Sequence, residues 1–202
     1  MSTKPSLFST DMVRAILEDR KTVTRRVVKP QPKYCAMSKA GLLISGGLIK
    51  AVDEIIHAAN AILLKLPYQP GDILYVRETF FKSKFGFHYK ADYQNGFCQY
   101  MSDDDRWHPS IHMPKEAARI FLRVTDVRVE RLQDMTVEDA AKDFGLEEFA
   151  IKAAGIAPFA SAMWNTTIKR TDRAIYGWAA NPWCWVIQFE RISKGEAQNE
   201  SG

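Results

Sequence analysis

The stretch Asp19-Arg20-Lys21-Thr22-Val23-Thr24-Arg25-Arg26 places one amine, two hydroxyls and three guanidinium groups around one predicted helix end. Before it, apolar residues recur at helical spacing after N-cap candidates, which predicts a helix from about Asp11 to Arg20. After it, β-branched residues favour an extended chain, and Pro30 prevents a return to helix. We therefore expect Lys21 and Thr24 at a helix-to-strand junction, from which side chains can point into a cleft.

The composition predicts one soluble domain. The chain has 202 residues, of which 46% are hydrophobic, enough for a single buried core. The net charge of +4 is compatible with an anionic partner, although an ordinary, slightly basic surface explains it equally well. No apolar run reaches the roughly 20 residues of a membrane span, and no signal-peptide pattern is found. We therefore expect a cytoplasmic protein that does not bind a membrane.

Neither a metal site nor a cofactor site is predicted. Cys35, Cys98 and Cys184 are far apart in the sequence, so we expect free thiols. His108 and His112 have the spacing of two ligands on one helix face, but nearby prolines oppose a helix and no third ligand stands at a useful distance. Structural or surface histidines are the favoured interpretation.

Strand and helix patterns continue along the chain. Strands are predicted over 4–8, 73–77, 120–132 (as a pair) and 183–190, and a helix capped by Thr136 is expected to end near Phe144 and Gly145. Residues 80–106 are aromatic and rich in turns, which predicts strands and a mobile acidic loop at 102–105. Two further segments are interpreted as insertions: 31–66, with helical periodicity over 51–65, and 147–173, which Trp164 is expected to anchor to the core.

Two clusters of side chains have both a structural and a functional interpretation. Arginines alternate with apolar residues along the predicted strand pair: Arg119, Arg123, Arg128 and Arg131. They form either a solvated basic face or a set of groups that bind phosphate. Three tryptophans near the C-terminus can either form a platform on which bases stack or belong to the core: Trp178, Trp183 and Trp185. For Trp183 and Trp185, which share one strand face, the core is favoured.

The order of these elements resembles the ASCH domain family, whose small β-barrel is similar to the PUA barrel of RNA-modifying proteins. The family signature is Gly-x-Lys-x-x-(Glu or Thr)-x-Arg; Lys21, Thr24 and Arg26 match it, whereas Asp19 stands at the glycine position. The whole layout is most similar to ASCH proteins of bacteriophages and prophages. The resemblance implies an α+β fold, in which helices flank a PUA-like β-barrel with the junction at the mouth of its cleft.

The same resemblance implies a domain organisation. A single ASCH or PUA-like domain is expected over 1–192, with helical insertions at about 31–66 and 147–173, followed by a frayed polar tail at 193–202.

One bacterial branch of the family removes acyl groups from the exocyclic nitrogen of acetylated cytidine, using a Lys, a Thr and a Glu. The resemblance assigns these roles here to Lys21, Thr24 and Asp143, and Asp is one methylene shorter than Glu. Three further carboxylates remain candidates for the acid: Glu78, Glu147 and Glu148. In such a mechanism Thr24 is the nucleophile, and Lys21 is its base if burial or neighbouring cations lower the amine's pKa.

The resemblance also implies that RNA or a modified nucleoside binds in the cleft. Candidate binding groups are three cations, a carboxylate and two aromatic rings that can stack on a base: Arg20, Arg25, Arg26, Glu78, Tyr89 and Trp107. Several classes of function remain open: a nucleoside deacylase, a non-catalytic RNA-binding module, a ribonuclease of phage origin, and a structural phage protein. The sequence predicts no particular protein partner.

Overall fold

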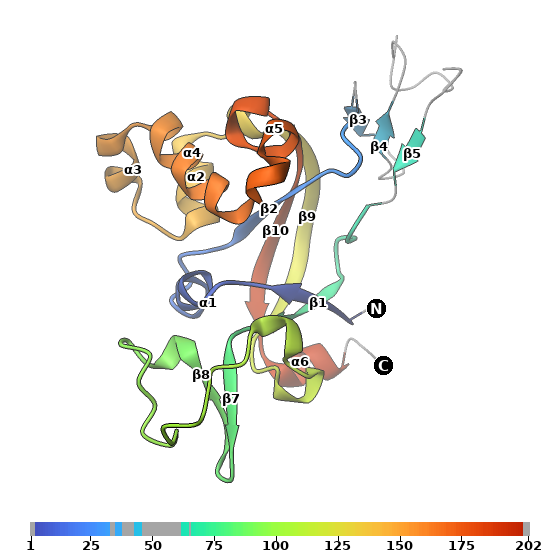
Figure 1. Ribbon diagram of the computed structural model, residues 1–202. Helices are drawn as coiled ribbons and strands as arrows, with labels where there is room; N and C mark the ends of the chain where they lie inside the picture. The colour runs from blue at the N-terminus through green and yellow to red at the C-terminus, as the bar shows by residue number, and fades with distance from the viewer. Residues whose placement is uncertain (1–2, 33–34, 38–42, 46–61, 65, 200–202) are drawn as a thin grey trace.

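A mixed five-stranded sheet organises the chain, of which the computed structural model describes residues 3–32, 35–37, 43–45, 62–64 and 66–199 (Figure 1). In order across the sheet, the strands are β1 (Thr3–Leu7), β6 (Ile73–Arg77), β9 (Phe121–Arg131), β10 (Trp183–Ile192) and β2 (Val23–Val27). β1 and β6 run parallel, and the other neighbours are antiparallel. The predicted α+β class is confirmed.

The helices of the described residues lie around this sheet. They are α1 (Thr10–Leu17), α2 (Val137–Phe144), α3 (Glu148–Ala154), α4 (Ile156–Thr167), α5 (Arg173–Tyr176) and α6 (Lys194–Asn199). Figure 1 shows α2 to α5 grouped at one end of the molecule, and the hairpin of β7 (Phe80–Ser83) and β8 (Gly86–Tyr89) at the other. Among the described residues, no helix has the length and apolar character needed to cross a membrane.

The sheet is open, so the expectation of a closed barrel is wrong for the described strands. β1 and β2 are its two edges. The free edge of β2 is partly occupied by other groups: the Lys21 Nζ donates to the carbonyl of Val23 at 2.7 Å, and the amide of Thr22 donates to the carbonyl of Lys142 at 3.2 Å. These groups occupy the start of the edge at which a further strand would pair.

Apolar clusters on its two faces hold β10 in place. Trp185 and Ile187 face a core that includes Ile16 of α1, and Cys184 faces a second core that includes Trp164 of α4. Burying a side chain of this size contributes roughly 1.5–3 kcal/mol relative to exposure. Trp185 is therefore part of the core, as favoured from the sequence, and Trp164 anchors α4 as predicted.

Two predicted elements have different forms in the structure. The segment 120–132 forms the single long strand β9 rather than a strand pair. In the predicted helical insertion 31–66, the described parts are β3 (Cys35–Met37), β4 (Leu43–Ser45) and β5 (Ile62–Leu64), which form an antiparallel three-stranded sheet. The rest of the predicted helix, residues 51–61 and 65, lies outside the described residues.

The predicted frayed tail contains an ordered helix, α6. The Ser193 hydroxyl accepts from the amide of Glu196 at 3.2 Å, and the Glu196 carboxylate accepts from the amide of Ser193 at 2.8 Å. This reciprocal capping starts the helix, and Ala197 is buried in a third apolar cluster. The Ser-x-x-Glu pattern was the local signal that the sequence interpretation missed.

The first helix ends at Leu17, three residues before the predicted end, because Asp19 adopts a left-handed conformation with φ of 55°. This is the position at which the family signature has glycine, the residue that adopts this conformation without a Cβ penalty. Aspartate tolerates it better than most residues, and Arg191 holds the Asp19 carboxylate with two hydrogen bonds of 3.0 and 3.1 Å. The departure from the signature therefore preserves the turn that leads into Lys21.

Substitutions at Asp19 test this account of the turn. We expect Asp19→Val to lower the free energy of unfolding by about 1–2 kcal/mol, because a β-branched residue is strained at this φ. Asp19→Gly loses the same contact with Arg191 but not the backbone conformation, and its stability should stay within about 0.5 kcal/mol of wild type. Urea denaturation measures both; equal losses in the two variants would show that the backbone conformation is not what matters.

Candidate functional site

Lys21 lies at the meeting point of α1, β2 and α2. Its side chain is fully buried, and Nζ donates to the carbonyls of Val23 and Asp143 and, at 2.9 Å, to the Asp143 carboxylate. The end of α2 approaches α1 closely at Gly145, where an added Cβ would lie 2.3 Å from the Cβ of Ala15. Glycine at this helix end thus allows the approach that brings Asp143 to Lys21.

A capping box fixes the other end of α2, as predicted. The Thr136 hydroxyl accepts from the amide of Asp139, and the Asp139 carboxylate accepts from the amide of Thr136. The helix buries one face against the second core and, in its last turn, directs Asp143 toward β2. The acid therefore comes from a short helix fixed at both ends, which limits the positions that its carboxylate can take.

Arg25 extends the Lys21–Asp143 pair into a buried ionic network. Its guanidinium lies 3.4 Å from the second carboxylate oxygen of Asp143, 3.3 Å from Glu130 and 3.7 Å from Asp139. The Arg25 side chain is fully buried. Asp143 thus lies between two buried cations, each of which depends on it for part of its charge compensation.

Burial is the largest influence on the Lys21 amine, and it lowers the pKa below 10.5 because the charged form loses solvation. The Asp143 carboxylate acts in the opposite direction, and Arg26 and Arg25 add to the lowering. The same surroundings raise the pKa of the Cys184 thiol to about 12, mainly through burial. Cys184 is therefore a protonated core residue, whereas Lys21 is closer to neutrality than an exposed lysine.

A pocket of about 210 Å³ lies along the β2 edge. Side chains of α1, β2, α2 and α4 line it together with residues just after β2 and α4: Met12, Thr24, Arg25, Arg26, Val27, Lys29, Asp143, Phe144, Trp164, Thr167 and Ile168. Its walls are thus mostly apolar, with one carboxylate, two hydroxyls and cations. The Thr24 hydroxyl has no hydrogen-bond partner among the described residues, so it is available to a ligand.

The free edge of β2 also presents main-chain groups beside this pocket. Hydrogen bonds from Val28 to Trp183 and from Phe189 to Thr22 fix the antiparallel pattern with β10. Because bonded pairs alternate along such a ladder, the amides of Arg25 and Val27 point away from β10. Both residues line the pocket together with Thr24, so this edge of β2 is a candidate source of main-chain donors for a ligand.

Five of the nine candidate residues therefore come together in or beside one pocket: Lys21, Thr24, Arg25, Arg26 and Asp143. The other four lie outside its lining. Arg20 pairs with the neighbouring Glu18 on the surface. Trp107 lies in a separate depression against Tyr93 and donates to the carbonyl of Gly96 at 2.8 Å.

Glu78 and Tyr89 belong to a second cluster, centred on Arg119. The Arg119 guanidinium donates to both oxygens of Glu78, at 2.9 and 3.1 Å, pairs with Asp92, and lies 4.0 Å from the centre of the Tyr89 ring. Burial raises the pKa of Glu78 although Arg119 acts against it. Glu78 is thus engaged away from the Lys21 pocket.

Neither of the remaining two candidate acids lines that pocket. Glu147 is exposed, and Glu148 pairs with Lys152 one helical turn further along α3. Asp143 is therefore the candidate acid that the structure brings to Lys21.

The arginines of the predicted basic strand face are each engaged within the chain. Their partners are acids for three of them and a carbonyl for the fourth: Arg119 with Glu78 and Asp92, Arg123 with Glu190, Arg128 with Asp126 and Glu130, and Arg131 with Asn181. A face on which three of the four cations already have acidic partners attracts phosphate weakly.

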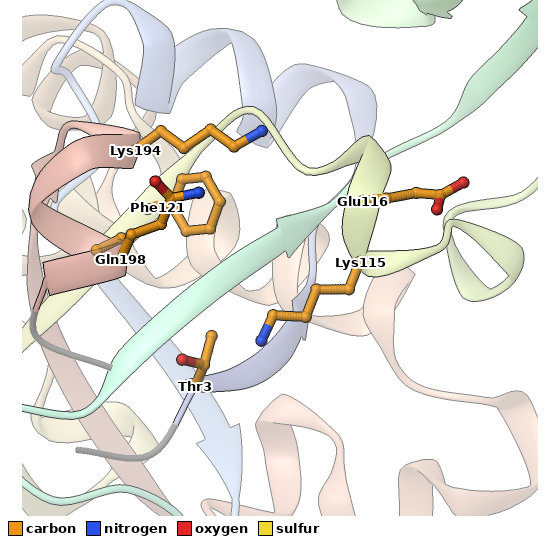
Figure 2. A pocket seen from close by; sticks show the side chains of 7 residues that line it. Thr3, Lys115, Glu116, Phe121, Lys194 and Gln198 are labelled. Carbon is orange, nitrogen blue, oxygen red and sulfur yellow. The ribbon is translucent and has the colours of Figure 1, made fainter. Parts of the chain in front are cut away.

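A larger pocket, of about 570 Å³, is lined by none of the candidate residues. Figure 2 shows its lining side chains, which come from β1, the 3₁₀ turn at Lys115–Ala117, β9 and α6. Lys115, Glu116, Lys194 and Gln198 are exposed there, and none of the described residues that line it is a buried ionisable group. Since perturbed, buried groups mark reactive sites better than volume does, we take the smaller pocket as the candidate site.

The sequence matches no family model, and neither a curated protein nor a solved structure matches the chain.

Several residues of the pocket were not recognised in the sequence as part of a site. Met12 and Phe144 belong to the apolar faces of helices, and Trp164 was interpreted only as an anchor. Thr167 comes from the segment interpreted as an insertion, and Lys29 from the chain after β2. None of them has a local motif, because the long-range packing of α4 against α2, which itself packs on β2, creates this wall.

Proposed function

We propose that the chain is an ASCH-like amidohydrolase that removes an acyl group from the exocyclic nitrogen of an acylated cytidine. The observation that carries this proposal is a fully buried lysine, Lys21, whose amine contacts Asp143 beside a pocket lined by the Thr24 hydroxyl. Buried ionisable groups that meet at a pocket are a recurring feature of catalytic sites. The element order, with its PUA-related sheet, and a cytoplasmic location are parts of the same proposal.

The size and lining of the pocket support a base-sized substrate. Its volume of about 210 Å³ suits one nucleobase with a small acyl group better than a whole nucleoside. Trp164, Phe144 and Ile168 offer apolar surface to a planar ring, while Asp143 and Thr24 offer polar groups near it. Asp143, held by Lys21 and Arg25, takes the role of the family's Glu in this proposal.

In the proposed reaction, the Thr24 oxygen attacks the acyl carbonyl carbon while Lys21, in its neutral form, accepts the hydroxyl proton. The amides of Arg25 and Val27 donate to the developing oxyanion. The bond between carbonyl carbon and exocyclic nitrogen then breaks, and the proton passes from Lys21 to the leaving cytidine amine. Water hydrolyses the acyl-threonine, which releases the carboxylic acid and restores Thr24.

The test is release of acetate and cytidine from N4-acetylcytidine by wild type, Thr24→Val and Thr167→Val. Both variants replace a pocket threonine by a residue of the same shape, but the Thr167 hydroxyl already donates to the carbonyl of Trp164 at 2.7 Å. We expect turnover by wild type and Thr167→Val, and none by Thr24→Val. Equal turnover by the two variants would exclude Thr24 as the nucleophile.

A binding module without turnover is the second candidate, and one observation favours it. The Lys21 Nζ donates to three acceptors on Val23 and Asp143, which is the full complement of a charged ammonium. A lysine held in this way orders the pocket and need not transfer a proton. This candidate predicts that cytidine binds but that N4-acetylcytidine is not cleaved.

A further inference from the structure

We propose that the substrate carries a phosphate group, which Arg26 and Lys29 bind at the mouth of the pocket, so that a nucleotide binds in preference to a free nucleoside. This inference rests on the proposed function for the identity of the base, whereas the phosphate site depends only on the cations at the mouth.

The size of the pocket places the phosphate outside it. Drug-sized ligands fill pockets of roughly 300–1,000 Å³. A volume of about 210 Å³ leaves room for a base with its acyl group, so the sugar and any group attached to it must project from the opening. The cations that such a group would meet are Arg26 and Lys29, which line the pocket and are exposed.

Arg26 is held in position but keeps most of its donors. One guanidinium nitrogen donates to the carbonyl of Leu7 at 2.8 Å, and the group lies 5.6 Å from the centre of the Phe8 ring. No carboxylate of the described chain pairs with it. Since a guanidinium has five N–H donors, several remain for a phosphate, and the fixed position reduces the entropy lost on binding.

Lys29 is the second cation of the pocket lining without an acidic partner among the described residues. Its Nζ lies 4.7 Å from the centre of the Tyr176 ring, and no hydrogen bond or ion pair engages it within the residues that the structure describes. Arg119, Arg123 and Arg128 differ in this respect, because each of them already has an acidic partner. Among these cations, the two at the mouth are therefore the ones available to an anion.

The interior of the pocket does not oppose an anion at the mouth. Among the described residues that line the pocket, Asp143 alone is a carboxylate, and Lys21 and Arg25 both contact it. Opposite charges at these distances largely cancel the field of the carboxylate, whereas the charges of Arg26 and Lys29 remain. A phosphate at the mouth thus meets a net positive potential.

Calorimetric titration tests the phosphate site with cytidine, cytidine 5′-monophosphate and a cytidine dinucleotide with a free 5′-hydroxyl. We expect at least one of the phosphate-bearing probes to bind about tenfold more tightly than cytidine, and this advantage to shrink with added salt. The monophosphate and the dinucleotide distinguish a terminal phosphate from a phosphodiester. Equal affinities for all three probes would overturn the proposal.

The matched variants are Lys29→Ala and Lys84→Ala. Lys84 also lies over an aromatic ring, 5.1 Å from the centre of Phe85, but does not line the pocket. The advantage of the phosphate-bearing probe should fall in Lys29→Ala and persist in Lys84→Ala; the same advantage in both variants would exclude Lys29. Failure of the proposed hydrolysis would appear separately, as binding of these probes without release of acetate from N4-acetylcytidine.

Discussion

Replacing Asp143 by alanine is expected to lower the free energy of unfolding by about 3–5 kcal/mol, the range for breaking a buried ion pair. The carboxylate lies between the fully buried side chains of Lys21 and Arg25. Its removal leaves the Lys21 amine without its ionic partner and takes one of three carboxylates from Arg25. The loss of stability is large because the buried Lys21 amine is already removed from water and gains no other ionic partner.

Asp126→Ala is the matched control, because its carboxylate pairs with Arg128 at 3.5 Å but is 49% exposed. An exposed pair contributes about 0–1 kcal/mol, so this variant should unfold close to wild type. Guanidinium chloride denaturation of both variants measures the difference. If Asp143→Ala were no less stable than Asp126→Ala, the buried network would not hold α2 against β2.

Lys21→Met is expected to fold but to lose turnover of N4-acetylcytidine by a factor on the order of 10²–10⁴, the range for general-base catalysis. Methionine fills a similar volume, and Asp143 keeps its contact with Arg25, so no buried carboxylate loses all its partners. In wild type, kcat/KM should rise with pH through the lowered pKa of Lys21, because only the neutral amine accepts a proton. A variant that retains turnover would assign Lys21 a structural role.

The pH dependence of stability in wild type and Lys21→Met provides an independent test of the lowered pKa of Lys21. Because the pKa of Lys21 is lowered in the folded protein from 10.5, its value in an unfolded chain, the unfolded chain binds more protons between the two pKa values. The contribution of Lys21 to the free energy of unfolding therefore increases with pH across that interval. We expect wild type to gain stability relative to Lys21→Met as pH approaches 10.5, and a constant difference would show that the pKa is not lowered.

Local signals in the sequence predicted much of the site. The β-branched run placed Thr24 on β2, and Thr136 with Asp139 predicted the start of α2. The resemblance to the ASCH family then implied Asp143, near the end of this helix, as the acid. The match to Lys21, Thr24 and Arg26 indicated which side chains to look for. These signals are short-range, and each depends on a few neighbouring residues.

Contacts between residues far apart in the sequence could not be predicted from these local signals. The open sheet depends on which strands pair with one another, and the wall formed by Trp164 and Thr167 depends on how α4 packs against α2. Glu78 follows β6 directly, and only the pairing with Arg119 shows that it belongs to another cluster. The strand β5 lies where helical periodicity was expected, since short apolar runs fit either period.

Acetate released from N4-acetylcytidine, followed side by side for wild type and Lys21→Met at one enzyme concentration, decides whether the Lys21 site is hydrolytic. We expect stoichiometric acetate and cytidine from wild type and almost none from the variant. Absence of acetate with wild type, or equal release by both proteins, would contradict a hydrolytic site built on Lys21, Thr24 and Asp143.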